Sequence, residues 1–222
     1  MAPDQVKFHF DPLCPWCYQT SRWAVRLEEL GAVGLDWGVF SLEVVNLPQD
    51  EDPLKLEARS GPALRTAIAI RDSEGSPAIG RFYTAFGKKV WEQAPPEQHN
   101  PETVRAALSD AGFDPELCDK ALADPATWEA VLDEHRALVE RTRSFGVPTI
   151  VLDGGTGPAI FGPVVSKLPS DDDALALWHH VSWLTRYENF SEVKRERSMP
   201  PDLPAAEWYR KEREKKKAAE RG

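Results

Sequence analysis

Alternating apolar and polar positions at the start of the chain predict a strand that leads into a helix. Residues 6–10 have the two-residue period of a strand with one face more buried. Asp11-Pro12-Leu13 breaks this period, and apolar residues from 23 to 30 then recur at helical spacing. Two glycines are expected to close that helix, Gly31 and Gly34. Residues 35–40 predict a second strand, so the chain opens with a β-α-β unit, which favours a parallel strand pair.

The middle of the chain has only helical periodicity. Several helices are predicted from a capping residue followed by proline, at Ser76-Pro77, Asn100-Pro101, Asp114-Pro115 and Asp124-Pro125. One apolar stripe is formed by Ile79, Phe82, Tyr83, Phe86 and Val90. A second is formed by Trp128, Val131, Leu132, His135, Leu138, Val139 and Phe145. Residues 53–124 are therefore predicted to be an all-helical insertion in an α/β frame.

The frame resumes after this insertion. Residues 146–152 predict a strand, Asp153-Gly154-Gly155 a turn, and residues 159–161 a short returning strand, which together form a hairpin. A last amphipathic helix is predicted to start near Ser170. The frame then comprises residues 1–52 and 125–190. Residues 191–222 are polar, interrupted by prolines and densely charged, which predicts a solvated tail whose last part is an exposed helix or disordered.

Composition and charge narrow the functional classes. The 222 residues, 41% of them hydrophobic and eight of them Trp, are enough for one domain with a large core. The formal net charge of −9 argues against general nucleic-acid binding. From Lys194 onward there are ten Lys or Arg and six Asp or Glu, hence +4 there and −13 on the remainder. We recognise no signal peptide and no run long enough to span a membrane, so we expect a cytoplasmic protein without membrane or nucleic-acid partners.

The candidate chemistry lies in Cys14-Pro15-Trp16-Cys17, at the junction of the first strand and helix. A Cys-x-x-Cys in this position is typical of a dithiol redox site. Pro15 fits the first helical position, which makes Cys14 the predicted N-cap and turns Cys17 inward. The free N–H groups at a helix N-terminus favour an anion, so we expect a lowered pKa for Cys14. Trp16 offers a flat apolar surface against which a substrate can pack.

The same residue types also have structural explanations. A zinc site usually needs four ligands, and no second Cys or His pair of suitable spacing accompanies the dithiol. Cys118 lies in a helical segment and is predicted to be a packing residue. His135 lies on an apolar stripe, which favours a hydrogen-bonded core histidine. His179 and His180 are adjacent and point to different helix faces. We therefore predict no metal site.

Several stretches together carry a resemblance to a known family. They are Phe10-Asp11-Pro12-Leu13-Cys14-Pro15-Trp16-Cys17 with Ser21-Arg22-Trp23, Ser41-Leu42 with Asn46, Gly61-Pro62, Val147-Pro148-Thr149, and Phe161-Gly162-Pro163 with Ser166-Lys167. This set resembles the DsbA-like branch of the thioredoxin superfamily, and more closely the actinobacterial mycothiol-dependent nitroreductase group. The likeness extends from about residue 6 to 197. Two differences fall near the expected substrate pocket: a short loop without a Tyr after Asn46, and Trp91 where a His often occurs.

The resemblance implies a fold, a chemistry and residue roles. The fold would be α/β, thioredoxin-like with a large helical insertion. Cys14 would be the nucleophile and Cys17 the resolving thiol. Pro15, Trp16, Asn46, Val147 and Pro148 would line the substrate groove, with Pro148 as a cis-proline beside the dithiol. The family also implies mycothiol or a similar low-molecular-weight thiol as co-substrate without a bound cofactor, nitro-aromatic reduction by some members, and a frequent homodimer.

Three hypotheses follow. The first is a thiol-disulfide oxidoreductase that is recycled by a low-molecular-weight thiol and acts on small-molecule or protein disulfides or on electrophilic acceptors. The second is a redox-switched, chaperone-like module that binds peptides. The third is a DsbA-like isomerase or reductase of polyketide-type aromatic molecules.

Overall fold

The computed structural model describes residues 2–219. It contains a four-stranded sheet, and the first predicted strand lies near the centre of this sheet. The strand order is β2-β1-β3-β4. β1 (Asp4–Phe10) pairs in parallel with β2 (Val33–Val39) and antiparallel with β3 (Thr149–Val151). β3 pairs antiparallel with β4 (Ala159–Phe161). Both the parallel opening unit and the later hairpin are thus confirmed.

The first helix, α1 (Pro15–Glu29), starts where the proline predicts it. It ends at Glu29 with Leu30 as its C-cap, and Gly31 takes a positive φ of 72°, the left-handed conformation that favours glycine after a helix. The expectation that Gly34 also closes the helix is wrong, because Gly34 lies inside β2.

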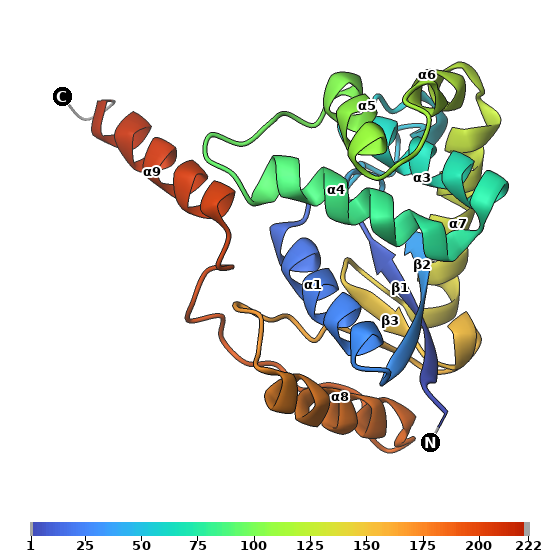
Figure 1. The fold of residues 1–222 in the computed structure, drawn as a ribbon, viewed down its shortest axis with the longest axis vertical. Helices are drawn as coiled ribbons and strands as arrows, with labels where there is room; N and C mark the ends of the chain where they lie inside the picture. The colour runs from blue at the N-terminus through green and yellow to red at the C-terminus, as the bar shows by residue number, and fades with distance from the viewer. Residues whose placement is uncertain (1, 220–222) are drawn as a thin grey trace.

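The remaining helices in the described part of the chain are α2 (Leu42–Val45), α3 (Gly61–Glu74), α4 (Ile79–Trp91), α5 (Pro101–Asp110), α6 (Glu116–Ala123), α7 (Ala126–Thr142), α8 (Asp171–Arg186) and α9 (Pro204–Ala219). Figure 1 shows their arrangement: some pack near the sheet, α5 and α6 pack on other helices, and α9 projects outward beside α4. Short 3-10 helices span Pro53–Lys55, Ser76–Ala78 and Asp153–Gly155. Within residues 2–219, no helix combines the length and the apolar content that a bilayer crossing requires.

Alternate residues of β1 face two different helices. Phe10 stacks on Tyr83 of α4, with ring centroids 4.1 Å apart. On the opposite face, Lys7 and His9 lie against Glu134 of α7, and the Lys7 amine is 2.7 Å from the Glu134 carboxylate. The two-residue period of this strand therefore separates two helical layers, with the apolar positions toward α4 and the polar ones toward α7.

The helical region and the sheet share one hydrophobic core. α4 approaches α1 closely because Gly87 has no side chain; a Cβ at this position would clash with the Tyr18 ring. The Tyr18 and Tyr83 rings meet edge-on at 5.7 Å between centroids. α8 closes the other side of α1, where the Trp23 and Trp178 rings lie 6.1 Å apart. The dithiol helix is thus held between α4 and α8.

Two expectations about the later chain are wrong. Phe145 does not continue the stripe of α7, because this helix ends at Thr142 and the Phe145 side chain is 67% exposed. The middle of the predicted solvated tail is buried: Leu203 is 3% exposed and Ala205 is fully buried. Figure 1 shows the C-terminal chain leaving α8, running along the side of the molecule and ending in α9 next to α4.

Candidate active site

Cys14 is the N-cap of α1, as the sequence predicts. Its backbone is extended, with φ −95° and ψ 107°, and its sulfur accepts a hydrogen bond from the backbone N–H of Cys17 at 3.3 Å. The thiol also donates to the carbonyl oxygen of Val147 at 3.7 Å. Cys14 is half-buried. This arrangement leaves one side of the sulfur accessible while the helix N-terminus contacts the other.

Cys17 lies behind Cys14 and is fully buried. Its thiol donates to the carbonyl oxygen of His9 on β1 at 3.8 Å. A substrate that approaches the N-terminal end of α1 therefore meets Cys14 first. This difference in exposure matches the expected roles of an attacking and a resolving thiol.

The expected lowering of the Cys14 pKa is wrong in direction. Burial raises the pKa of Cys14 above its ordinary value of 9.0, and the N–H groups of Cys17 and Trp16 lower it only in part. The negative charge of Asp11 raises the Cys14 pKa further, whereas Arg197 lowers it. The pKa of Cys17 is also raised well above its usual range by its complete burial. Sequence reasoning considered the helix terminus and missed the desolvation.

Asp11 is a site residue whose role sequence reasoning missed. Its carboxylate is fully buried and accepts hydrogen bonds from the backbone N–H groups of Leu13 at 2.8 Å and Leu42 at 2.6 Å. Its own carbonyl accepts from the N–H of Cys14 at 3.1 Å. Burial raises the pKa of Asp11 from 3.8 to about 7. Asp11 thus joins the loop before Cys14 to the segment after β2, and its charge changes near neutral pH.

Tyr83 is a second missed residue, since the sequence placed it only in an apolar stripe. Its side chain is 1% exposed. Its hydroxyl has no conventional hydrogen-bond partner among the described residues. It lies close enough to the Cys17 thiol to lower the pKa of Cys17 against the effect of burial. A buried phenol beside the resolving thiol is a hydrogen-bond donor available to a thiolate.

The residues assigned to the groove by resemblance do not all meet in one place. The Val147–Pro148 peptide bond is cis, as predicted, and the Val147 carbonyl contacts the Cys14 thiol. Asn46 is exposed at the end of α2, and its side-chain amide donates to the carbonyl of Leu42 at 2.7 Å. None of these three residues lines the cavity next to the dithiol.

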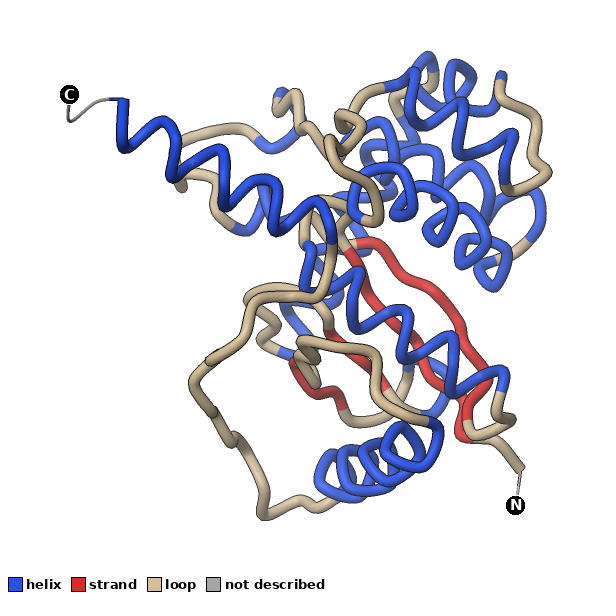
Figure 2. Tube along the Cα trace, turned by 60° about the vertical axis from the view of Figure 1, so that its left-hand side comes forward, coloured by secondary structure: helices blue, strands red, loops and turns tan. Residues whose placement is uncertain are grey.

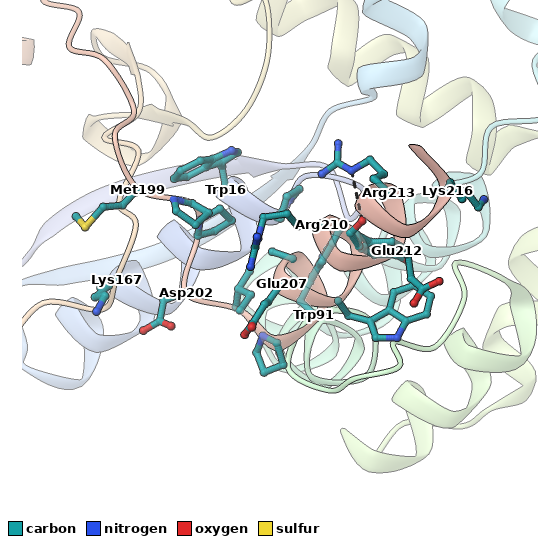
Figure 3. Close-up of a pocket in the computed structure, with 18 residues that line it drawn as sticks. Trp16, Trp91, Lys167, Met199, Asp202, Glu207, Arg210, Glu212, Arg213 and Lys216 are labelled. Atoms are coloured by element: carbon teal, nitrogen blue, oxygen red, sulfur yellow. Dashed lines mark hydrogen bonds between the residues drawn. The ribbon is translucent and has the colours of Figure 1, made fainter. Parts of the chain in front are cut away.

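This cavity of about 1090 Å³ is lined by Pro15 and Trp16 at the start of α1, by Trp91 of α4, and by the C-terminal chain (Figure 3). The indole N–H of Trp91 donates to the carbonyl of Pro12 at 3.0 Å, so this residue also fixes the loop before Cys14. The sequence placed Trp91 near the expected pocket, and it lies in the wall of this cavity. Sequence reasoning missed the contribution of the C-terminal chain.

The other candidate residues have structural surroundings. The Cys118 thiol is buried and donates to the carbonyl of Pro101 at 3.8 Å. His135 accepts a hydrogen bond from the N–H of Ser41 at 3.3 Å and packs on Phe40, and burial lowers the pKa of His135 to about 4. Within residues 2–219, no three His, Cys, Asp or Glu side chains are grouped closely enough to hold a metal ion.

The sequence and the geometry both match known proteins. Residues 13–195 match the model of the Rv2466c-like family, described as mycothiol-dependent nitroreductase Rv2466c. The chain is 33% identical over 199 residues to the uncharacterized protein Rv2286c of Mycobacterium tuberculosis, covering 89% of this chain and 84% of that protein.

Solved structures show the same fold. One is a 2-hydroxychromene-2-carboxylate isomerase, with a TM-score of 0.57 and 20% identity, covering 82% of this chain and 96% of that chain. Another is a probable DsbA oxidoreductase of Streptomyces coelicolor, with a TM-score of 0.53 and 18% identity, covering 90% of this chain and 98% of that chain. These likenesses confirm the DsbA-like thioredoxin fold that the resemblance implied.

Proposed function

Because the chain belongs to the Rv2466c-like family, we propose that it is a thiol-disulfide oxidoreductase recycled by mycothiol or a similar low-molecular-weight thiol. One observation supports this above all. A half-exposed cysteine forms the N-cap of α1, and a fully buried second cysteine lies one helical turn behind it. Because a dithiol needs one thiol that substrate can reach and one that is shielded until a mixed disulfide forms, the pair suits a two-step exchange.

The reaction runs as follows. The Cys14 thiolate attacks one sulfur of a substrate disulfide, whose S–S bond breaks, and one substrate thiolate leaves. The Cys17 thiolate then attacks Cys14 in this mixed disulfide, which forms the Cys14–Cys17 disulfide and releases the second substrate thiol. Two electrons have passed to the substrate. Two molecules of the external thiol reduce the protein disulfide and become the corresponding disulfide.

The raised pKa of Cys14 predicts the pH dependence of the first step. Because burial raises the pKa of Cys14, only a small fraction of this thiol is ionised at neutral pH. The rate constant for attack should therefore rise about tenfold per pH unit from pH ~7 to ~9. The proton released by Cys17 passes to solvent or to Asp11, whose pKa of about 7 suits an acceptor near neutral pH.

Nitro-aromatic compounds are the finer part of the proposal, supported by the description of the family. Reduction of a nitro group to a nitroso group takes two electrons and two protons and releases water, which one dithiol can supply as it becomes a disulfide. We propose the cytoplasm as the compartment, because recycling requires a thiol that is kept reduced, and thiols are kept reduced in the cytoplasm. The homodimer stays a prediction, and the molar mass measured by light scattering during size-exclusion chromatography tests it.

A trapping experiment tests this function. Cys17→Ser protein is incubated with mycothiol disulfide or with cell extract, and its mass is measured. We expect a mycothiol adduct on Cys14 that does not resolve, because the second thiol is missing. Cys14→Ser protein should show no adduct and no turnover, and Cys118→Ser is the matched control that should behave as the wild type.

The outcomes separate the hypotheses. Turnover that survives in Cys14→Ser protein would exclude the mechanism. A protein trapped on Cys14 in place of a small thiol would favour the peptide-binding hypothesis, and an aromatic adduct would favour the isomerase or reductase of polyketide-type molecules.

A further inference from the structure

The C-terminal chain returns to the dithiol. We call residues 191–219 the C-terminal arm. Its middle is fixed to the loop after β4: the Ser166 hydroxyl donates to the carbonyl of Met199 at 3.1 Å, and the N–H of Asp202 donates to the carbonyl of Ser166 at 2.7 Å. Figure 2 shows the same path, with a long loop that leads from α8 to the last helix beside the start of α1. The arm is thus a structural part of the site.

The arm completes the aromatic cavity beside Cys14. In Figure 3, Trp16 and Trp91 lie on two sides of the space, and side chains of α9 occupy the rest of its wall. The Tyr209 ring of α9 approaches Trp91 with centroids 6.4 Å apart. Flat apolar groups therefore line the cavity from the dithiol helix to the arm, and a planar aromatic ligand is the shape that such walls hold best.

The free charges at this cavity are mainly positive. Arg197 of the arm is not in the cavity wall but lies next to it, over the ring of the lining residue Trp16, with its guanidinium carbon 5.2 Å from the ring centroid. Among residues 2–219, Arg213 bonds only to the backbone carbonyl of Tyr209 in its own helix, and Lys167 takes part in no ion pair. The acidic residues of α9 that line the cavity, Glu207 and Glu212, are each paired with a lysine of that helix. This leaves Asp202 as the remaining lining carboxylate.

We propose that the C-terminal arm makes this site select anionic aromatic disulfides, with Arg197 and Arg213 as the residues that hold the anionic group. The inference rests on the proposed function and names its substrate class. In this arrangement the aromatic ring packs against Trp16 inside the cavity, and the carboxylate faces the two arginines. The Cys14 thiolate attacks the nearer sulfur of the disulfide, the S–S bond breaks, and the second aromatic ring leaves as a thiolate.

Two further observations support this assignment. The match to the family model ends at residue 195, so Arg197 and α9 lie outside the matched part. In addition, the positive charge of Arg197 lowers the pKa of Cys14. The same guanidinium can therefore attract an anionic substrate and favour the thiolate that attacks it.

Two chromogenic disulfides test the proposal. Reduced protein is mixed with dithiobis-nitrobenzoate, which carries carboxylates, or with dithiodipyridine, which is neutral, and the released aromatic thiol is followed by absorbance. The measured quantity is the ratio of the two second-order rate constants. We expect Arg197→Gln combined with Arg213→Gln to lower this ratio about fivefold. The loss of the two guanidinium groups removes a charge-assisted contact with the substrate carboxylate, which at an exposed site contributes about 1 kcal/mol to binding of the anionic disulfide and nothing to that of the neutral one.

The controls keep the two proposals separate. Arg195→Gln removes one charge from the same arm, two residues from Arg197, and should leave the ratio unchanged. A ratio that falls as much in Arg195→Gln as in the double variant would mean general charge attraction and overturn the inference. An unchanged ratio in the double variant would overturn it as well. Loss of reaction with both disulfides in wild-type protein would instead contradict the proposed dithiol function.

Discussion

The two sides of the dithiol differ in how they are built. The inner side consists of Asp11, Cys17, Tyr83 and the Val147 backbone, and the side chains of these residues are at most 4% exposed. The outer side consists of the cavity wall, where Trp16 and Trp91 meet the C-terminal arm. On the inner side, every titratable group has a raised pKa because of burial. On the outer side, the exposed Arg197 lowers the pKa of the half-buried Cys14 through its charge.

This difference separates the two tasks of the site. Groups buried in a low-dielectric environment have shifted pKa values and fixed positions, which suits proton handling and thiol exchange. Exposed charges on an arm are weak individually and easily exchanged, which suits the choice of substrate. Substitutions on the inner side should therefore change stability and the exchange steps, whereas those on the outer side should change which substrates react.

The largest effect is expected from Asp11→Asn on the inner side. In the wild type, the folded pKa of about 7 lies above the unfolded value of 3.8, so this carboxyl contributes stability at acidic pH that is lost as the pH rises toward 7. The full shift corresponds to on the order of 4 kcal/mol. The Asp11→Asn variant cannot ionise at this position, so its stability should not fall in this way as the pH rises. Between about pH 4 and about pH 8, its free energy of unfolding should gain roughly 4 kcal/mol relative to the wild type, measured by urea denaturation.

An exposed carboxylate provides the control for Asp11. Hydrogen bonds from Glu116 N–H and from Lys120 lower the pKa of Asp114, so its contribution is present above its unfolded pKa and lost on acidification. The Asp114→Asn variant should therefore show a pH dependence of opposite sign and smaller size. If Asp11→Asn and the wild type had parallel stability profiles, the buried ionisation of Asp11 would be ruled out.

A smaller effect should follow from loosening the outer side with Leu203→Ala. Leu203 is 3% exposed at the start of α9, and loss of its packing should destabilise the docked arm by about 2–3 kcal/mol. We expect amide hydrogens of α9 to exchange faster while those of α1 and β1 keep their protection, because the arm can open without unfolding the core. Hydrogen exchange followed by mass spectrometry measures both regions at once.

The matched change is Leu175→Ala on α8, where the side chain is 39% exposed. It should alter stability by less than about 0.5 kcal/mol and leave the exchange of α9 unchanged. Equal loss of protection in α1 and α9 of the Leu203→Ala protein would show that the arm belongs to the same cooperative unit as the inner side, and the two sides would then not be separate.

The sequence could predict the inner side better than the outer one, for a physical reason. The period of residues 6–10 and the proline after Cys14 are local signals, and the structure confirms the strand, the N-cap and the buried Cys17. The raised pKa of Cys14 was missed because burial depends on groups distant in sequence. The docking of the C-terminal arm was not predicted. The arm is densely charged, which is typical of a solvated tail, and only a few apolar residues such as Leu203 hold it against the rest of the protein.

The smallest effect is expected from Tyr83→Phe, which removes one buried hydroxyl. This hydroxyl lowers the pKa of Cys17, so its loss should raise that pKa further and slow the resolution of a mixed disulfide about threefold, as expected for one modest hydrogen bond. Stability should be nearly unchanged because the hydroxyl lacks a conventional partner. The rate is measured by stopped-flow release of the second aromatic thiol.

Tyr18→Phe is the control. It breaks the 2.7 Å hydrogen bond to Glu92 and should lower the free energy of unfolding by about 1 kcal/mol without slowing the resolution of the mixed disulfide. Equal slowing in both variants would assign the effect to packing of the two rings, whereas slowing in Tyr83→Phe alone places the phenol in the exchange step.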